Sequence, residues 1–338
     1  MTATFPLGPF QPSPANPILT PRGESWESAN VYNPAAIVDD GQVVLLYRAH
    51  AADRVSRIGL ARSDDGIHFQ RESEPVLAPE HDYESAGCED PRITRIGETF
   101  YLTYTAYDGK RAQLCLATSD DLHTWNRHGP LFPDFNTWRA LPYGPETAWS
   151  KAGVIHPEPI DSRYWMWFGE GAIHAATSTD LLHWTPVADD LHPLHTPAPA
   201  GWDNILVEIG APPVLTDDGL LVFLTNGAGL TNGAGLSGPE DLTYSGGQIA
   251  VSVNDPAALA AKTPEPWLRP TSHEETHGMV SNVTFVEGLV EFQGRWLAYY
   301  GQSDTTIGVA GCPARSATEP TRDTRSRPHP LSSAPGQP

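Results

Sequence analysis

The chain has 338 residues, 39% of them hydrophobic, a length that suits one large domain or two ordinary ones. Its net charge of −20 and pI near 4.9 argue against partners such as nucleic acid or an anionic membrane surface. The three cysteines lack metal-binding spacing, and the chain has no signal peptide and no long apolar run, so we expect a cytoplasmic protein with reduced thiols.

A repeated unit runs along the chain, and it predicts the fold. Three clear copies read as a strand, an Asp/Gly turn, a strand ending in aromatic residues, a strand of small residues and a Ser-Asp or Thr-Asp turn, and they begin at residues 33, 90 and 151. Two weaker copies begin at residues 210 and 282. Their alternating apolar and polar residues indicate half-buried strands. One unit cannot bury its own faces, whereas five units around an axis can, so we predict an all-β, five-bladed β-propeller over residues 1–312. The polar segment 313–338 is predicted to be a disordered tail.

The first strand of a propeller blade usually lines the central channel, so the five unit starts should converge on the axis. Asp90, in the stretch SAGCEDPR, is therefore a candidate acid for chemistry in a channel active site. Glu208, Glu287 and Asp304 lie at corresponding edges of other units. Glycoside cleavage needs one acid and a second carboxylate or an outside nucleophile, and carboxylates that share a cavity raise each other's pKa. The simpler alternative is that Asp90 caps a turn and Glu208 is solvated.

Two further patterns have plainer explanations. The stretch from His273 to His277 matches HExxH, but that zinc chemistry needs a helix, and Pro270 and Gly278 flank the motif. We expect an exposed polar loop there and no metal. The sequence LTNGAG occurs twice in tandem, at 224–229 and 230–235. We expect a duplicated glycine-rich surface loop, with a lid over the channel as the alternative.

Several motifs together resemble glycoside hydrolase family 130, five-bladed propellers that act on β-mannosides. They are CEDPR (88–92), LTYTAYDG (102–109), LATSDDLHTW (116–125), WSKAGVI (149–155), GAPPV (210–214), NVTFVEG (282–288) and YYGQSDTTIGVA (299–310). The resemblance implies that Asp90 is the general acid, which relays its proton through a mannose hydroxyl with inversion at the anomeric carbon. It also implies a set of sugar-binding residues: Arg48, Arg92, Tyr104, Asp108, Lys151 and Asp304.

What attacks the anomeric carbon divides the family into phosphorylases and hydrolases. The resemblance implies that phosphorylases hold phosphate with a lysine before G-x-P-P and a histidine on the next strand. Here the lysine position holds Glu208 and the histidine stretch reads Leu-Thr-Asn-Gly, with Asn226, although Arg111 and Arg127 could keep part of a cationic cradle. Two like charges about 4 Å apart cost on the order of 4 kcal/mol at an effective dielectric near 20, roughly three powers of ten in affinity.

We therefore expect an inverting β-mannosidase that acts on β-1,2-linked manno-oligosaccharides, with Glu208 as the base that activates water and Glu287 as the second choice. Water between acid and base predicts a separation of about 6.5–9.5 Å between Asp90 and Glu208. Three alternatives stay open: a β-mannoside phosphorylase that yields mannose 1-phosphate, a non-catalytic sugar-binding propeller, and a zinc peptidase. We expect no cofactor, and the sequence leaves linkage, chain length and oligomeric state open.

Overall fold

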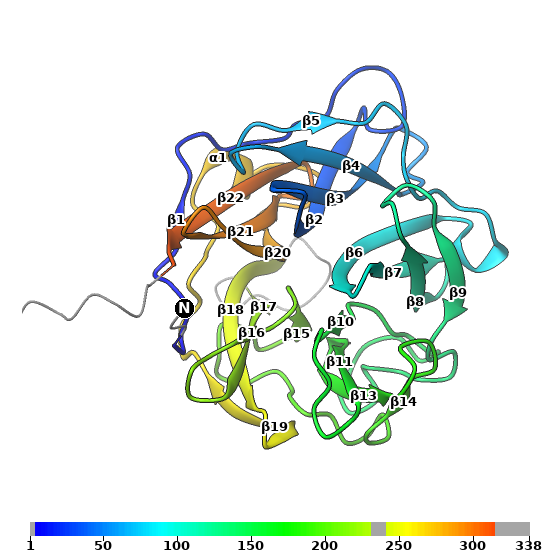
Figure 1. The fold of residues 1–338 in the computed structure, drawn as a ribbon, viewed down its shortest axis with the longest axis vertical. Coiled ribbons are helices and arrows are strands. Elements are labelled where there is room, and N and C mark those ends of the chain that lie inside the picture. The colour runs from blue at the N-terminus through cyan, green and yellow to red at the C-terminus, as the bar shows by residue number, and fades with distance from the viewer. Residues whose placement is uncertain (1–3, 231–240, 315–338) are drawn as a thin grey trace, which may run out of the picture.

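The computed structural model describes residues 4–230 and 241–314. Within them five β-sheets stand around a central axis like the blades of a propeller, as predicted (Figure 1). The predicted tail over 313–338 lies outside the described residues, apart from Pro313 and Ala314.

The blades follow one another in chain order, and the first strand of a blade is the innermost. Blade 1 contains β2 (Asn30–Asp39), β3 (Gln42–His50), β4 (Arg57–Ser63) and β5 (Gln70–Arg71). Blade 2 contains β6 (Gly87–Ile96), β7 (Thr99–Tyr107), β8 (Ala112–Ser119) and β9 (Asn126–Pro130). Blade 3 contains β10 (Val154–Ile155), β11 (Tyr164–Phe168), β13 (His174–Ser178) and β14 (Thr185–Pro186).

The last two blades recruit strands from elsewhere in the chain. Blade 4 contains β15 (Leu206–Ile209), β16 (Val214–Leu215), β17 (Leu220–Leu230), β18 (Leu242–Ser252) and β19 (Asp255–Lys262), and β12 (Glu170–Gly171) joins it at β15. Blade 5 contains β20 (Thr284–Phe292), β21 (Arg295–Gln302) and β22 (Thr306–Pro313), and its outer strand is β1 (Gln11–Pro12). Two short helices, the 3-10 helix η1 (Asp82–Glu84) and α1 (His273–Thr276), complete the described elements.

The ring is closed by the N-terminal segment, which the repeat pattern did not predict. Gln11 pairs with Gly311 and Pro12 with Ala310, so β1 covers the edge of β22. Leu7 exchanges two backbone hydrogen bonds of 2.8 Å with the buried side chain of Gln248. A two-residue strand therefore joins the first residues of the chain to blade 5 and blade 4.

The middle strands are buried on both faces, so the prediction of half-buried strands is wrong for them. Residues Val43 to Tyr47 of β3 are all buried. Val43 and Leu45 pack with blade 5, whereas Val44 and Leu46 pack with blade 2. Each strand thus supplies alternate side chains to two interfaces between blades, because every blade is packed against a neighbour on either side.

The repeated Ser-Asp segments cap the turns that lead to the outer strands. In blade 1 the Ser63 hydroxyl accepts the Gly66 N–H, and Oδ1 of Asp65 accepts the N–H groups of Ile67 and His68 at 2.8 Å. Blades 2 and 3 repeat this arrangement with Ser119 and Ser178. Side-chain acceptors of this kind satisfy backbone groups at a turn, so these residues are structural.

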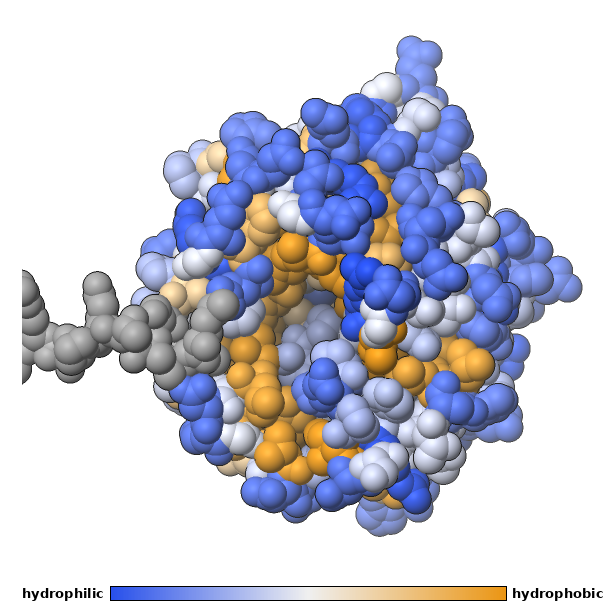
Figure 2. Space-filling view, in the orientation of Figure 1, coloured by the Kyte–Doolittle hydropathy of each residue, from blue (hydrophilic) through white to orange (hydrophobic). Residues whose placement is uncertain are grey.

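One face of the ring is apolar at its centre. Figure 2 looks onto a central hollow around which hydrophobic side chains gather. At this end of the axis the inner strands line a hollow of about 520 Å³ with residues 36–38, 93–95, 212–215 and 289–291, together with Pro157 and Trp296. The polar residues of the candidate site lie at the beginnings of the same inner strands, toward the other end.

Candidate active site

Irregularities in the inner strands aim polar side chains at the axis. Strand β2 shifts register around Asn33 and β6 around Asp90, and both residues adopt positive φ values, 49° and 48°. Strand β20 shifts register in the same way around Glu287. A β-bulge leaves one residue out of the ladder and re-aims its side chain. Three bulges therefore supply an amide and two carboxylates to one region.

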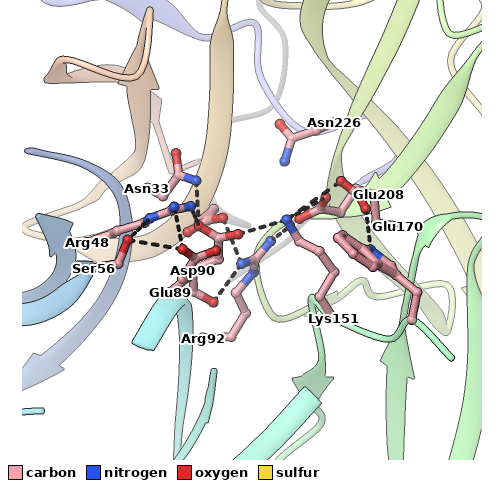
Figure 3. A network of polar contacts seen from close by, with 12 residues as sticks. Asn33, Arg48, Ser56, Glu89, Asp90, Arg92, Lys151, Glu170, Glu208 and Asn226 are labelled. Carbon is pink, nitrogen blue, oxygen red and sulfur yellow. Dashed lines mark hydrogen bonds and ion pairs between the residues drawn. The ribbon is translucent and has the colours of Figure 1, made fainter. Parts of the chain in front are cut away.

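Asp90 is buried and its two oxygens have different partners (Figure 3). Oδ1 accepts hydrogen bonds from Nδ2 of Asn33 at 2.8 Å and Nη1 of Arg48 at 2.9 Å. Oδ2 lies 2.8 Å from Nζ of Lys151. Burial raises the pKa of Asp90, but Lys151, Arg48 and Arg92 outweigh burial, so the pKa lies below its ordinary value. Asp90 is a carboxylate in this arrangement.

Arg92 fills the axis directly behind Asp90. Its Nη2 donates to Oε1 of Glu208 at 2.9 Å, and its Nη1 lies 2.7 Å from Oε1 of Glu287. The guanidinium also donates to the carbonyl oxygens of Gly210, Ile209 and Asp90. Burial raises the pKa of Glu208 to about 7 and that of Glu287 well above its usual range, although Arg92 opposes both shifts.

Lys151 stands between three carboxylates. Besides Asp90, its Nζ lies 3.7 Å from Oε1 of Glu170 and 3.7 Å from Oε2 of Glu208. Glu170 faces Glu208 because β12 pairs with β15 in that register. Its Oε2 accepts the indole N–H groups of Trp149 at 2.8 Å and Trp138 at 3.3 Å. Glu170 therefore has one oxygen fixed by tryptophans and the other turned toward Lys151.

These groups surround a cavity of about 240 Å³. Its lining consists of Asn33, Arg48, Asp90, Lys151, Glu170, Tyr244, Val280, Val283, Phe285 and Asp304. Burial raises the pKa of Asp304 to about 6, with Arg48 opposing the shift. A concave site with convergent polar groups and perturbed carboxylates has the features of an enzyme active site.

The structure brings seven of the eleven predicted site residues together. Asp90, Arg48, Lys151 and Asp304 line the cavity, and Arg92, Glu208 and Glu287 form the layer behind Asp90.

The other four predicted residues lie elsewhere. The Tyr104 hydroxyl donates to Glu84 at 2.8 Å inside blade 2, and Asp108 caps its own turn by accepting the N–H groups of Lys110 and Arg111. Arg111 is exposed 3.7 Å from Asp108, and Arg127 pairs with Glu80 at 2.7 Å on the outermost strand of blade 2. These four residues do not line the cavity, because they point into a blade or outward from the axis.

Sequence reasoning left out Asn33, Glu170 and Tyr244 as site residues. Asn33 had a detectable signal, since Asn33-Pro34 matches Asp90-Pro91 at the start of the next unit. Glu170 lay in no recognised motif, and only the pairing of β12 with blade 4 places it beside Glu208. Asn226, expected at a phosphate-binding position, instead exchanges hydrogen bonds of 2.7 and 2.9 Å with the backbone of Val286 and ties blade 4 to blade 5.

The HExxH segment differs from its expected form. The HExxH segment forms the short helix α1 with a capping box at Ser272, where a loop was predicted. Its Glu275 is buried and accepts the Tyr300 hydroxyl at 2.9 Å, which is a structural role. Across residues 4–230 and 241–314 no group of three or more His, Cys, Asp or Glu side chains could hold a metal ion.

The first LTNGAG copy lies inside strand β17, so the prediction of a loop is wrong there. Beyond Leu230 the second copy falls outside the described residues. In the described part of the chain no helix is long and apolar enough to cross a membrane.

A five-bladed propeller with a carboxylate-rich cavity at one end of its axis is an architecture suited to glycoside chemistry. Comparison with known proteins makes this specific. Residues 14–319 match the family described as β-1,4-mannooligosaccharide phosphorylase, and the chain belongs to glycoside hydrolase family 130.

Curated relatives and solved structures of this family span nearly the whole chain. A 1,2-β-oligomannan phosphorylase from Thermoanaerobacter sp. (strain X514) is 36% identical over 87% of this chain and 94% of its own length. A β-1,2-mannobiose phosphorylase from the same organism is 31% identical with the same coverage. One solved structure is 33% identical to this chain. It was reported with the finding that the family of mannoside phosphorylases contains glycoside hydrolases that target β-1,2-mannosidic linkages in Candida mannan. It has a TM-score of 0.80 and covers 95% of this chain and 99% of that one.

Proposed function

We propose that this protein is an enzyme that cleaves β-mannosides, with Asp90 as the general acid and with water, activated by Glu208, as the nucleophile. The β-mannoside substrate is supported by the names of the four curated relatives, three of which are named for β-1,2-linked mannosides. The charge of the site favours water as the nucleophile.

The observation that carries hydrolysis is the excess of carboxylates over cations. Three cations, Arg48, Arg92 and Lys151, each contact at least two carboxylates. Opposite them stand six carboxylates: Glu89, Asp90, Glu170, Glu208, Glu287 and Asp304. A phosphate dianion would enter a site whose cations are already neutralised, and each additional like-charge contact at about 4 Å costs on the order of 4 kcal/mol at an effective dielectric near 20.

Glu208 is the candidate base, and from its buried place behind the cavity lining it would act on a water held beside Asp90 and Lys151. Its Oε1 is held by Arg92, whereas no hydrogen bond is found for its Oε2 within the described residues. A pKa near 7 lets a carboxylate accept a proton from water at neutral pH. Inversion at a β-linkage then yields the α-anomer of mannose.

The separation of acid and base is shorter than predicted. Because Lys151 Nζ lies 2.8 Å from Asp90 and 3.7 Å from Glu208, the two carboxylate oxygens are at most 6.5 Å apart. The separation of these oxygens is therefore no larger than the lower limit of the spacing of about 6.5–9.5 Å typical of inverting enzymes.

Phosphorolysis is the second candidate, and the comparisons favour it. The four curated relatives that match the chain are all described as phosphorylases. In that reaction Asp90 keeps its role, phosphate replaces water, and the product is mannose 1-phosphate.

One experiment separates the two candidates. β-1,2-Mannobiose and β-1,4-mannobiose are incubated with the protein with and without inorganic phosphate, and products are followed by proton NMR. Hydrolysis predicts α-mannose at equal rates in both conditions. Strict dependence on phosphate, with mannose 1-phosphate as product, would establish phosphorolysis instead.

Two variants test the assigned residues. Glu208→Gln is expected to lower kcat by about 10²–10⁴-fold, the contribution of a general base, and Asp90→Asn by a similar factor. Glu98→Gln is the matched control, because Glu98 is 94% exposed on the surface of blade 2. Normal hydrolysis by Glu208→Gln would remove Glu208 from the mechanism.

A further inference from the structure

The two oxygens of Asp90 are not equivalent as carriers of a proton. Oδ1 already accepts two hydrogen bonds, from the Asn33 amide and from Arg48. Arg48 is itself fixed by Glu89 at 2.6 Å and by the Ser56 hydroxyl at 2.9 Å. An arginine stays protonated and an amide nitrogen only donates, so a proton placed on Oδ1 would face two donors. The acidic proton of Asp90 belongs on Oδ2.

Lys151 occupies that position in the structure. Its Nζ lies 2.8 Å from Oδ2 of Asp90. An ammonium group is also only a donor, so a proton on Oδ2 leaves a much weaker acceptor for it and places two positive hydrogens beside each other. The contact that neutralises Asp90 therefore disfavours the protonated form that a general acid needs.

A second place for Lys151 is available beside the first. The free side of the ammonium group faces Oε1 of Glu170 and Oε2 of Glu208, both 3.7 Å away. Oε1 of Glu170 is held in place because the other oxygen of that carboxylate binds two indole N–H groups. A lysine side chain is a flexible four-carbon stem with a compact charge, so a movement of about 1 Å away from Asp90 would lengthen that contact beyond hydrogen-bond distance and shorten the contacts with Glu170 and Glu208.

We propose that Lys151 is a displaceable counter-ion of Asp90, which a mannoside pushes from Oδ2 onto Glu170 and Glu208 when it enters the cavity. As Lys151 leaves with its own proton, Asp90 takes one proton from solvent on Oδ2 and becomes the acid. Lys151 is thus a positioning residue that allows Asp90 to become protonated only when sugar is bound. The inference rests on Asp90 as the acid of the proposed function and holds for water or phosphate as nucleophile.

The charges around Asp90 support this coupling. Lys151, Arg48 and Arg92 lower the pKa of Asp90, and Lys151 is the strongest of the three. The other ionisable groups facing this site are Tyr32 from β2, Glu89 from β6, Glu170 from β12, Glu208 from β15, Tyr244 from β18, Glu287 from β20 and Asp304 after β21. The two tyrosines are neutral because burial raises their pKa values, and the ionised carboxylates among the others favour uptake of a proton by Asp90 when Lys151 moves away.

The first test compares pH profiles of the wild type with those of Lys151→Met. For the wild type, kcat/KM should fall at a lower pH than kcat, because the free enzyme loses the proton of Asp90 more readily than the complex with sugar does. Between these two falling limbs of the pH profiles, KM should rise about tenfold per pH unit. In Lys151→Met the limb of kcat/KM should move up by about 1–3 pH units, and the limb of kcat should move much less. Lys151→Arg, which keeps a cation, should retain the wild-type separation. Lys110→Met, on the exposed β7–β8 turn, is the matched control.

The second test needs no variant that might fail to fold. Binding of a sulfur-linked β-1,2-mannobiose, which is not cleaved, is measured by calorimetry at pH 7 in buffers of different ionisation enthalpy. We expect net proton uptake by the wild type, as Asp90 gains more than Glu208 releases, and no uptake by Asp90→Asn.

The outcomes separate this inference from the proposed function. Binding by the wild type without proton uptake, or equal shifts of both pH limbs in Lys151→Met, overturns the role of Lys151. Undiminished turnover by Asp90→Asn overturns the proposed function itself. If Asp90→Asn is inactive but the wild type takes up no proton, only the displacement of Lys151 is refuted.

Discussion

Replacing Arg92 measures how much its ion pairs on the propeller axis contribute to the stability of the fold. Replacing Arg92 with methionine keeps much of the side-chain length but leaves Glu208 and Glu287 buried without their common cation. Removing one partner of a buried ion pair costs about 3–5 kcal/mol. Unfolding entropy of about 2.1 cal/mol/K per residue gives roughly 0.6 kcal/mol/K for about 300 ordered residues, so Tm should fall by about 5–8 °C.

The pH dependence identifies the cause of that loss. Without Arg92 the pKa values of Glu208 and Glu287 rise further, and at pH 5 both groups are neutral at little cost. The deficit in Tm relative to the wild type should therefore be smaller at pH 5 than at pH 8, as scanning calorimetry can show. Arg95→Met is the control, because Arg95 pairs with Asp39 and Glu98 at the surface. A fall of less than about 2 °C, or equal falls at both pH values, would refute the reasoning.

Three further predictions concern stability and positioning. Deleting residues 1–12 removes β1 and leaves the Gln248 side chain without its two hydrogen bonds to the backbone of Leu7. The Tm measured by thermal denaturation should therefore fall by several degrees, whereas an unchanged Tm would mean that blade 5 closes without β1. Gly171→Ala places a Cβ 2.4 Å from the ring of Trp138, at a φ of +85°. Because Trp138 donates a hydrogen bond to Glu170, this clash should disturb Glu170 and lower kcat/KM in a mannobiose assay, whereas normal kinetics would show that Trp138 can move. Folding raises the pKa of Glu208 to about 7, so the contribution of Glu208 to stability is present below about pH 4.5 and is lost as pH rises through 7. In urea titrations, the free energy of unfolding of Glu208→Gln should therefore depend less on pH over this range than that of the wild type.

The sequence predicted the architecture because the fold is repetitive. A unit that recurs every sixty residues or so, and that cannot bury its own faces, leaves few arrangements other than a ring. The same logic located Asp90 on an inner strand and led to Glu208 and Glu287, whereas Arg92 came from the family resemblance. Each lies within a few residues of a unit start, where the position along the chain specifies the distance from the axis.

The sequence did not reveal contacts made between units. Strand β12 leaves blade 3 to pair with blade 4, and β1 crosses from the N-terminus to blade 5, yet both are two residues long and carry no hydropathy pattern. Tyr104 and Asp108 were misplaced for a different reason. They lie in LTYTAYDG, one of the motifs behind the family resemblance, but β7 is a middle strand whose side chains pack between blades, and the turn after it lies away from the axis.

Arg92 also decides how molecules can travel in this ring. Its guanidinium is buried on the axis between the polar cavity and the apolar hollow of the opposite face, with partners on β6, β15 and β20. Within the described residues the two hollows share no lining residue, which indicates a cul-de-sac and not a tunnel. A mannoside chain cannot thread through the protein and be cut at successive bonds in passing. Whatever occupies the innermost position must leave by the mouth through which the next substrate arrives, so release of the innermost sugar competes directly with substrate entry.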